Sequence, residues 1–557
     1  MKMFLALCAT VLCALVAVAS ASAATAKRPP ALTPVAHDAL TRALERGRLT
    51  EARYSLERAR SLFALDRVRR QYGQVGAASP REATAILRDL AARFRSLSGK
   101  DRADASAILA RPTDSADPYE QHYRANAILA KACDATRPLC VHWDERATNR
   151  DSPPGADGNI STIPADVTAT LTTFAQVWDL EVATYGFQAP LSDATSSNDG
   201  GDGRTDIYMV DLGRASLFGY CTSDDPNAFD LSYSYFDISA YCVVDEDFAD
   251  FGMSQTPQEF REVTAAHEFF HAIQFSYDWF EDLWLMEGTA MFMEGQFRPA
   301  VEDRIRYLAN SVLTSPSTPV DRGADGFEYG AWIWWRYLTE ELGELPDPVA
   351  VRQVWESAAG ASVDTDGPGP DTNANDLYSL QSLVSVLSNR GLVFKTLVGK
   401  FAWVNRIPFT FYTEGSSYPR ALPSRTYTLG ARGSGTGWRS VRLRHLASNY
   451  TAFKPGVNAS RTADLRISVD LPRPQYGSKA FVLVRPVGQP WHTHEIALDA
   501  FGNGARRVAF GRGAVREVDL VLTNASARMR CGRGTYYSCA GVGADDQRTY
   551  SFRATVR

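Results

Sequence analysis

The sequence is poor in histidine and carries no excess of positive charge. Only 8 of its 557 residues are His, and 59 Lys and Arg stand against 64 Asp and Glu, for a formal charge of −5. Proteins dedicated to nucleic acid usually show a strong basic excess, so we expect no nucleic acid partner. The sequence also has no C-x-x-C pair, which argues against a zinc site built from cysteines.

Long apolar runs are missing beyond the start of the chain, so we expect no membrane span. The start itself has a recognisable order. Residues 1–3 form a short, positively charged segment. Residues 4–18 are apolar apart from Thr10, and the small residues A-S-A follow at 21–23. This order predicts a signal peptide over residues 1–23, and therefore a secreted or periplasmic protein. A membrane anchor is the weaker interpretation, because the apolar run is short and a cut site follows it.

Six cysteines remain after the expected signal peptide, in three pairs that are close in sequence. An exported protein meets an oxidising environment, where disulfides form and persist. Six cysteines permit fifteen connectivities, and the simplest of these is local pairing. We therefore predict the disulfides 133–140, 221–242 and 531–539.

A chain of 557 residues is too long for one ordinary hydrophobic core, so several domains are expected. Residues 24–112 are rich in Ala, Arg and Leu at helical spacing. The sequence S-P-R-E at 79–82 matches a capping box, with Pro80 at the first helical position. Such a segment is either a pro-region that blocks the site of a secreted hydrolase or a permanent helical subdomain. The sequence favours neither interpretation over the other.

The rest of the chain divides into two parts. Residues 113–420 combine strand patterns with a long helical region from residue 256 to 410. Residues 425–557 show short alternating segments separated by Gly, Pro and Asn, which is typical of an antiparallel β-sandwich. The predicted fold class is a multidomain α+β protein with a helical N-terminal segment and a C-terminal sandwich.

The strongest chemical signal is H-E-F-F-H at residues 267–271. On a helix, His267 and His271 lie on one face, so both imidazoles can bind one Zn²⁺ ion. Glu268 projects about 100° round the helix from His267, close enough to act on a water molecule at the metal. The sequence T-P-Q-E at 256–259 predicts a capped helix start, and apolar residues lie on the side away from the histidines.

A catalytic zinc ion needs a third protein ligand, for which Glu287 is the best candidate. It lies sixteen residues after His271, where two helices joined by a tight loop would bring it against the histidines. A metzincin would need histidine at the position of Tyr277, so the sequence excludes that class.

Four other carboxylates compete with Glu287 for the metal. Asp278, Glu281 and Asp282 lie in the expected connecting turn, where a solvated charge is the commoner outcome. Glu294 lies seven residues after Glu287 on the same helical face. It is suited to orient a histidine by accepting a hydrogen bond from the ring nitrogen that faces away from the metal.

The combination of H-E-x-x-H at 267–271 with W-x-x-E-G at 284–288 resembles gluzincin-type zinc metallopeptidases. Within them the chain looks most like secreted bacterial members of uncertain specificity. The likeness covers residues 110 to 420 and includes G-D-G-R-T-D-I-Y at 201–208 and E-Y-G-A-W at 328–332. It implies a zincin-like α+β catalytic domain, with His267, His271 and Glu287 as zinc ligands and Glu268 as catalytic base. The spacing from His271 to Glu287 is shorter than in the thermolysin and aminopeptidase patterns.

The expected function is a secreted zinc-dependent endopeptidase, made as a proenzyme, that hydrolyses peptide bonds of proteins or peptides. Tyr329 is the candidate donor to the oxyanion, because it follows the metal helices. The neighbouring tryptophans offer Tyr329 a purely structural role in the core as the alternative. Two other functions stay open: an aminopeptidase, and an extracellular binding protein that uses a peptidase-like scaffold.

Calcium is a second candidate ion. Asn198, Asp199, Asp202 and Asp206 crowd a Gly-rich loop, and residues 245–247 form another acidic cluster. Calcium favours such oxygen-rich loops, although the spacing does not match an EF-hand and acidic loops are often simply solvated. The sequence gives no indication of an oligomeric state.

Overall fold

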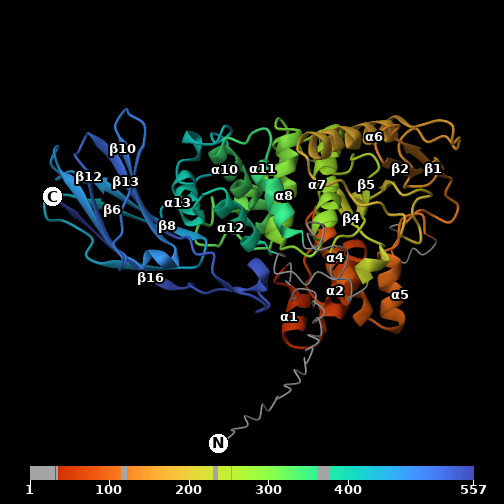
Figure 1. The fold of residues 1–557 in the computed structure, drawn as a ribbon, viewed down its shortest axis with the longest axis horizontal. Coiled ribbons are helices and arrows are strands. Elements are labelled where there is room, and N and C mark those ends of the chain that lie inside the picture. Colours follow the sequence, from red (N-terminus) through yellow and green to blue (C-terminus); the bar gives the residue numbers. More distant parts are fainter. Residues whose placement is uncertain are drawn as a thin grey trace, which may run out of the picture.

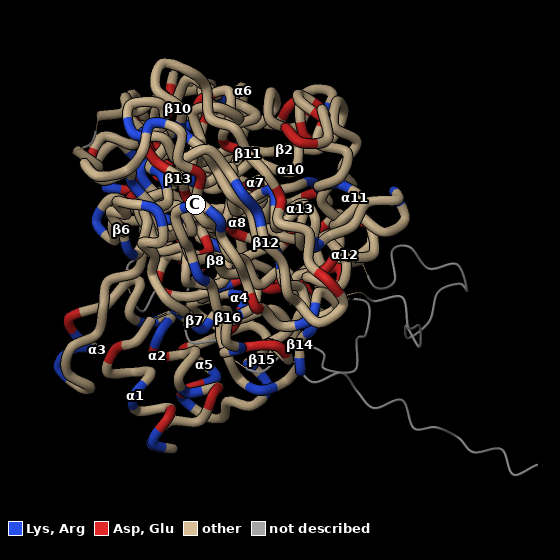
Figure 2. The backbone as a smooth tube through the Cα atoms, turned by 90° about the vertical axis from the view of Figure 1, so that its left-hand side faces the viewer, with Lys and Arg blue, Asp and Glu red and all other residues tan. Residues whose placement is uncertain are grey.

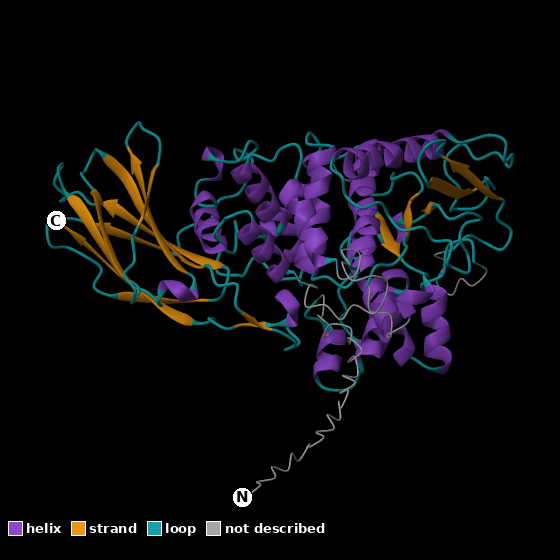
Figure 3. Cartoon of the chain, in the orientation of Figure 1, coloured by secondary structure: helices purple, strands orange, loops and turns teal. Residues whose placement is uncertain are grey.

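The computed structural model describes residues 32, 36–114, 119, 122–229, 236–252, 254–359, 377 and 379–557. The predicted signal peptide, residues 1–23, lies outside these residues. The chain is a mixed α+β protein of elongated shape, with a β-rich part at one end (Figure 1, Figure 3). None of the helices in the described ranges has the length and apolar character needed to cross a membrane.

Helices occupy the N-terminal segment, as the pattern predicted: α1 (Ala39–Glu45), α2 (Glu51–Phe63), α3 (Leu65–Tyr72), α4 (Ala83–Arg93) and α5 (Gly99–Ile108). The predicted start of a helix at Pro80 is wrong. Helix α4 begins at Ala83, although one half of the predicted capping box is present, because the Glu82 carboxylate accepts from the Ser79 N–H at 2.9 Å. The Arg81 guanidinium instead turns into the protein and pairs with Glu294, with 2.8 Å between Nε and Oε1. This buried ion pair overrides the local preference for an earlier helix start.

A five-stranded sheet follows: β1 (Leu129–Cys133), β2 (Leu139–Asp144), β3 (Thr205–Val210), β4 (Gly219–Thr222) and β5 (Tyr241–Asp245), in the order β1-β2-β3-β5-β4. Strands β2, β3 and β5 are parallel, and the edge strands β1 and β4 are antiparallel to their neighbours. Helix α6 (Ala165–Trp178), extended by a π-helical turn (Asp179–Thr184), packs beside β2. The strands expected near residues 139 and 206 and the helix expected near 166 are therefore confirmed.

The predicted helical region comprises α7 (Pro257–Tyr277), α8 (Leu283–Phe297), α9 (Phe327–Gly330), α10 (Trp332–Leu342), α11 (Val349–Ala358), α12 (Leu380–Asn389) and α13 (Phe394–Val404). A 3-10 helix (Glu302–Asn310) lies between α8 and α9. The capping box of α7 is confirmed, because Thr256 accepts from the Glu259 backbone N–H and the Glu259 carboxylate caps Thr256 in return. One continuous core links α2 and α4 with the sheet, α7 and α8. Helices α2, α4 and α5 therefore pack as part of the same body (Figure 1), whereas α1 and α3 contribute to a separate small core.

The C-terminal part consists of two sheets that share a core built from residues such as Phe453, Ile467, Leu520 and Tyr550. One sheet has the order β11 (His492–Glu495), β10 (Ser478–Pro486), β13 (Val515–Asn524), β8 (Ala447–Pro455) and β6 (Arg425–Leu429). The other has the order β12 (Asn503–Ala509), β9 (Asp464–Asp470), β16 (Arg548–Val556) and β7 (Arg439–Leu443). Pairing within both sheets is antiparallel except between β6 and β8.

A small hairpin of β14 (Met529–Arg530) and β15 (Val542–Gly543) extends from the C-terminal part towards the helices. Its loop carries Cys539, whose backbone N–H donates to the Asp282 carboxylate at 2.8 Å, directly before α8. The three predicted disulfides are all present, at 133–140, 221–242 and 531–539. They are consistent with an extracellular or periplasmic protein.

Candidate metal centre

Helices α7 and α8 bring together the three residues predicted as metal ligands. The Nε2 atoms of His267 and His271 lie 3.1 Å apart. Glu287 Oε2 lies 3.3 Å from Nε2 of His267 and 3.6 Å from Nε2 of His271. All three side chains are buried. In the part of the chain that the structure describes, this is the one cluster of potential ligand atoms that contains histidine.

The opposite ring nitrogens already have acceptors. Nδ1 of His267 lies 3.0 Å from Oε1 of Glu294, as predicted for that residue. Nδ1 of His271 lies 2.8 Å from Oε1 of Gln274. The Gln274 amide nitrogen donates to the Met286 carbonyl and the Thr289 hydroxyl, so its oxygen must be the atom that accepts. Both Nδ1 atoms therefore donate, and both Nε2 atoms present lone pairs to the centre of the cluster.

Electrostatics in this cluster favour a positive charge at its centre. Burial alone would lower the pKa of His267, but the carboxylates of Glu287 and Glu294 outweigh it and raise the pKa to about 9. Burial also opposes ionisation of Glu287, yet the neighbouring histidines hold its pKa at about 2. Three acceptor atoms that face one another in a buried site repel unless a proton or a cation lies between them.

The spacing of the three atoms fits zinc. A tetrahedral zinc ion with bonds of about 2.0–2.2 Å to nitrogen and oxygen holds its ligand atoms about 3.3–3.6 Å apart. The three observed separations run from 3.1 to 3.6 Å. Glu287 Oε2 accepts no hydrogen bond from any described residue although it is buried. The donor set, two imidazoles and a carboxylate, is one that catalytic zinc sites use.

Glu268 lies beside this cluster and is fully buried. Its Oε2 accepts a hydrogen bond from the Thr84 hydroxyl at 3.1 Å, and no described residue pairs with its Oε1. Burial raises the pKa of Glu268 above the usual range. A carboxylate with one free oxygen and reduced solvation is a suitable proton acceptor.

The N-terminal segment reaches into the site. The Thr84 hydroxyl accepts from the Cys221 backbone N–H at 2.9 Å, and the Pro80 carbonyl accepts from the Phe218 backbone N–H at 3.0 Å. Residues 80–84 thus run along the edge strand β4 and over Glu268. Arg81 extends the contact, because it pairs with Glu294, which in turn orients His267.

Sequence reasoning missed Thr84, Arg81 and Gln274 as parts of the site. Gln274 had a local signal, since it lies three residues after His271 on the same helix and so within reach of its ring. Thr84 and Arg81 had none, because 184 residues separate Thr84 from Glu268 and 213 separate Arg81 from Glu294.

Tyr329, the predicted oxyanion donor, is buried in α9. Burial and then the charge of Glu287 raise its pKa well above the ordinary value. Its hydroxyl makes no hydrogen bond to any described residue. A buried hydroxyl that feels the charge of a metal-ligand candidate and lacks a partner is compatible with a role towards substrate.

The competing carboxylates of the connecting turn accept hydrogen bonds from backbone N–H groups instead. Glu281 accepts from the Ser379 N–H at 3.2 Å, and Asp282 accepts from the Cys539 N–H. Asp278 accepts from the Phe280 N–H at 2.7 Å. Of the carboxylates considered for the third position, Glu287 is the one placed between the histidines.

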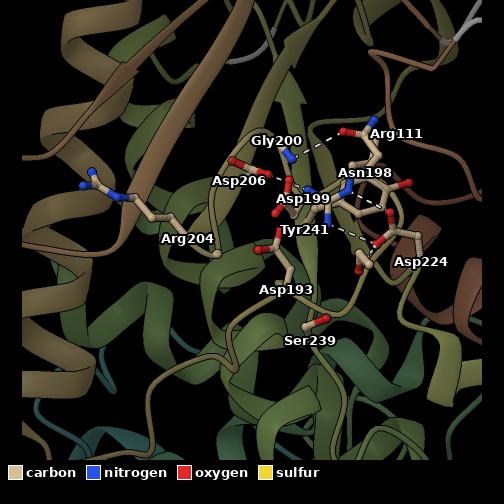
Figure 4. Close-up of polar contacts among 12 residues, drawn as sticks. Arg111, Asp193, Asn198, Asp199, Gly200, Arg204, Asp206, Asp224, Ser239 and Tyr241 are labelled. Carbon is tan, nitrogen blue, oxygen red and sulfur yellow. Dashed lines mark hydrogen bonds and ion pairs between the residues drawn. The ribbon is translucent and has the colours of Figure 1, made fainter.

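The Gly-rich acidic loop proposed for calcium lies next to a fully buried arginine. Arg111 pairs with Asp206 at 2.5 Å and with Asp193 and Asp224 at 2.8 Å each (Figure 4). His142 approaches the other oxygen of Asp206 at 2.7 Å. Here a side chain of the protein itself supplies the cation.

In the second acidic cluster, Asp245 and Glu246 have ligand atoms within 4.8 Å of each other and of Asp211, whereas the Asp247 carboxylate accepts from the Ala249 N–H at 2.7 Å. The Asp245 carboxylate accepts from the backbone N–H groups of Leu212, Gly213 and Phe248, which accounts for its burial. Calcium binding at either cluster stays a prediction.

The chain matches no family model and no curated protein. Among solved structures it shows a similarity to "A novel family GH115 4-O-Methyl-alpha-glucuronidase, BtGH115A, with specificity for decorated arabinogalactans". The sequence identity is 9% and the TM-score 0.14, over 54% of this chain and 38% of that one. The chain thus spans well under half of that structure, and a likeness this low carries no argument about fold or function.

Proposed function

We propose that the chain is a zinc-dependent endopeptidase that acts on proteins or peptides outside the cytoplasm. One observation carries the proposal. Three acceptor atoms, from His267, His271 and Glu287, meet at distances that fit zinc, while the surroundings fix both Nδ1 atoms as donors. The adjacent Glu268 adds the general base that hydrolysis requires.

The residues of the site have separate tasks in this chemistry. A zinc ion at this position supplies the Lewis acidity that activates water and polarises a carbonyl group. Glu268 takes a proton from the water at its free Oε1 and delivers it to the leaving amine. The Tyr329 hydroxyl donates to the oxyanion of the substrate. Glu294 and Gln274 hold the two imidazole rings in place.

We also propose that the N-terminal segment is a pro-region and not a permanent subdomain. His267, Glu268, His271 and Glu287 are at most 1% exposed, so no substrate can reach them in this arrangement. Residues 80–84 cover Glu268 and accept hydrogen bonds from the backbone N–H groups of Cys221 in the edge strand β4 and of Phe218 directly before it, a position that an extended peptide could take by adding a strand. Arg111, which is anchored by three carboxylates, would remain with the catalytic part.

Metal analysis combined with hydrolysis of a protein substrate tests the enzyme assignment. We expect about one zinc ion per chain in the wild type and in Glu268→Gln, and none in His271→Ala. Glu268→Gln should lower the rate about 10²- to 10⁴-fold. Glu262→Gln is the matched control, because Glu262 lies on the same helix but pairs with Arg298 and should change neither quantity. Absence of zinc from the wild type, or full activity of Glu268→Gln, would refute the assignment.

Cleavage of the full chain tests the pro-region separately. A recognition sequence for a specific protease is inserted after Ser98, between α4 and α5. Cutting there should raise the rate of substrate hydrolysis, and adding a peptide of residues 76–98 should lower it again. A chain that binds zinc and is as active before the cut as after it contradicts the pro-region and leaves the peptidase assignment intact.

A further inference from the structure

The C-terminal part of the chain and the rest of the chain carry net charges of opposite sign. Residues 425–557 contain 21 Lys and Arg against 8 Asp and Glu, a formal charge of +13. Residues 1–424 contain 38 Lys and Arg against 56 Asp and Glu, a formal charge of −18. The total of −5 hides this separation. Figure 2 looks onto the β-rich end and shows Lys and Arg on β12 and beside β6 and β7. Charge separated in this way marks a surface that attracts anions.

Part of the positive charge lies on the outward face of the sheet β12-β9-β16-β7. Leu465, Ile467 and Val469 of β9 point into the core, so alternation places Arg466 and its pleat neighbours on the outer face. On that face Arg507 lies directly opposite Arg466. The same face carries Arg553, opposite Ser468, and Arg442, opposite Thr549. All four arginines are exposed.

These arginines are poorly compensated. Among the described residues, no carboxylate lies within ion-pair distance of Arg442, Arg466 or Arg553, whereas Arg507 pairs with Asp464 at 2.6 Å. Like charges directly opposite on a sheet destabilise it, so the pair Arg466–Arg507 has a cost in the free protein. An anionic ligand that bridges the guanidinium groups would offset that cost.

The residues between the arginines are short and polar. They are Ser440, Ser468, Ser551, Thr549 and Thr555. Their hydroxyl groups can donate and accept hydrogen bonds, and their small size leaves the longer guanidinium groups above the surface. Trp438 lies at the edge of the same face, 51% exposed, with the Arg553 guanidinium 5.2 Å from its ring. The face therefore combines cations, hydroxyls and one exposed aromatic ring, with the carboxylates of Asp464 and Asp470 at the two ends of β9.

We propose that this face binds a linear anionic polysaccharide. Guanidinium groups match carboxylate or sulfate groups, and serine and threonine hydroxyls match sugar hydroxyls. Surfaces for single-stranded nucleic acid use several aromatic rings on which successive bases stack, whereas this face has one. Binding of a polysaccharide to this face does not depend on the metal centre. It would hold the protein at a polyanionic matrix.

Binding of the full chain to immobilised heparin and to polygalacturonate tests the proposal, with single-stranded oligothymidylate as the competing probe. We expect both polysaccharides to bind at low salt and more weakly at about 0.15 M salt. The triple variant Arg442→Ser, Arg466→Ser, Arg553→Ser should bind at least about tenfold more weakly. Metal content is measured in parallel, so that loss of binding is separated from any failure of the zinc assignment.

A second triple variant controls for net charge. Arg425→Ser, Arg485→Ser and Arg516→Ser remove three arginines from the other sheet and should leave binding nearly unchanged. Far-ultraviolet circular dichroism and a thermal midpoint check that both variants fold. The proposal is overturned by absence of polysaccharide binding at low salt, by equal losses in the two triple variants, or by tighter binding of the oligonucleotide.

Discussion

The candidate metal centre and the Arg111 cluster are both largely buried and rich in acidic side chains, but only the Arg111 cluster contains its own guanidinium cation. In the Arg111 cluster a guanidinium of the chain itself lies against Asp193, Asp206 and Asp224. In the candidate metal centre, three acceptor atoms face one another at 3.1 to 3.6 Å, and no donor from any other described residue is directed between them. A high density of carboxylates therefore does not mark a cation site, whereas acceptor atoms left facing one another do.

The largest expected effect comes from removing the built-in cation. Arg111→Met leaves the buried carboxylates of Asp193 and Asp206 and the partly buried one of Asp224 without this partner, and should destabilise the protein by about 3–5 kcal/mol in denaturant unfolding. Zinc content should stay unchanged, because the cluster shares no residue with the metal centre. Arg137→Met is the control, since this partly exposed ion pair should contribute at most about 1 kcal/mol. Loss of zinc from Arg111→Met would show that the two clusters are not independent.

A second built-in cation is His445, which joins the C-terminal sheets to the helical part. Its Nε2 lies 3.1 Å from Asp321 and its Nδ1 lies 2.7 Å from Asp546, so carboxylates engage both nitrogens. Burial lowers the pKa of His445, but Asp321 and then Asp546 raise it to about 10. This histidine is therefore an imidazolium at neutral pH, and among the described residues its site does not gather three mutually close ligand atoms as the candidate metal centre does.

A pH titration of stability tests that distinction. Because the pKa is raised on folding, the stabilisation by His445 is fully present below the ordinary pKa near 6.5 and is lost as pH rises through about 10. The expected loss is of the order of 3 kcal/mol between these limits. The measurement is the difference in unfolding free energy between wild type and His445→Gln at each pH. A difference that does not shrink towards alkaline pH would contradict the charged interface.

How far the sequence could predict these features depends on how many positions separate the contacting residues along the chain. His267 and His271 are neighbours on one helix, and Glu287 follows across one short turn, so local spacing was enough to group them. Thr84 and Arg81 act on residues more than 180 positions away, and local patterns contain no information about such contacts. The same long-range ion pair explains why the predicted helix start at Pro80 failed.

The positive net charge of the C-terminal part could be counted from the sequence, but the net charge of the whole chain does not show it. A formal charge of −5 excluded a basic protein, although residues 425–557 alone carry +13. Which arginines share a face could not be predicted in the same way. That depends on strand register, and a slip by one residue would turn Arg466 towards the core.

A smaller effect is expected from the residue that orients the candidate metal ligand His267. Glu294→Ala removes the acceptor for its Nδ1 and should weaken zinc binding about 10- to 100-fold. Competition with a chromogenic chelator measures this affinity. Glu262→Ala, on α7 and outside the cluster, should bind zinc as the wild type does. Equal affinities for Glu294→Ala and wild type would mean that the outer acceptor contributes nothing to the metal centre.

The smallest expected effect comes from a variant that lowers the stability of helix α7 without changing the affinity of the site for zinc. Thr256→Ala removes the N-cap of α7, where the Thr256 side chain accepts from the Glu259 N–H and the Glu259 carboxylate caps the Thr256 N–H. Loss of such a cap costs about 1 kcal/mol of folding free energy. The cap lies three turns before His267, so zinc affinity should not change while the unfolding midpoint falls. Weaker zinc binding in Thr256→Ala would indicate that helix α7 transmits strain from its start to the metal ligands, and that the site is less rigidly held than its hydrogen bonds imply.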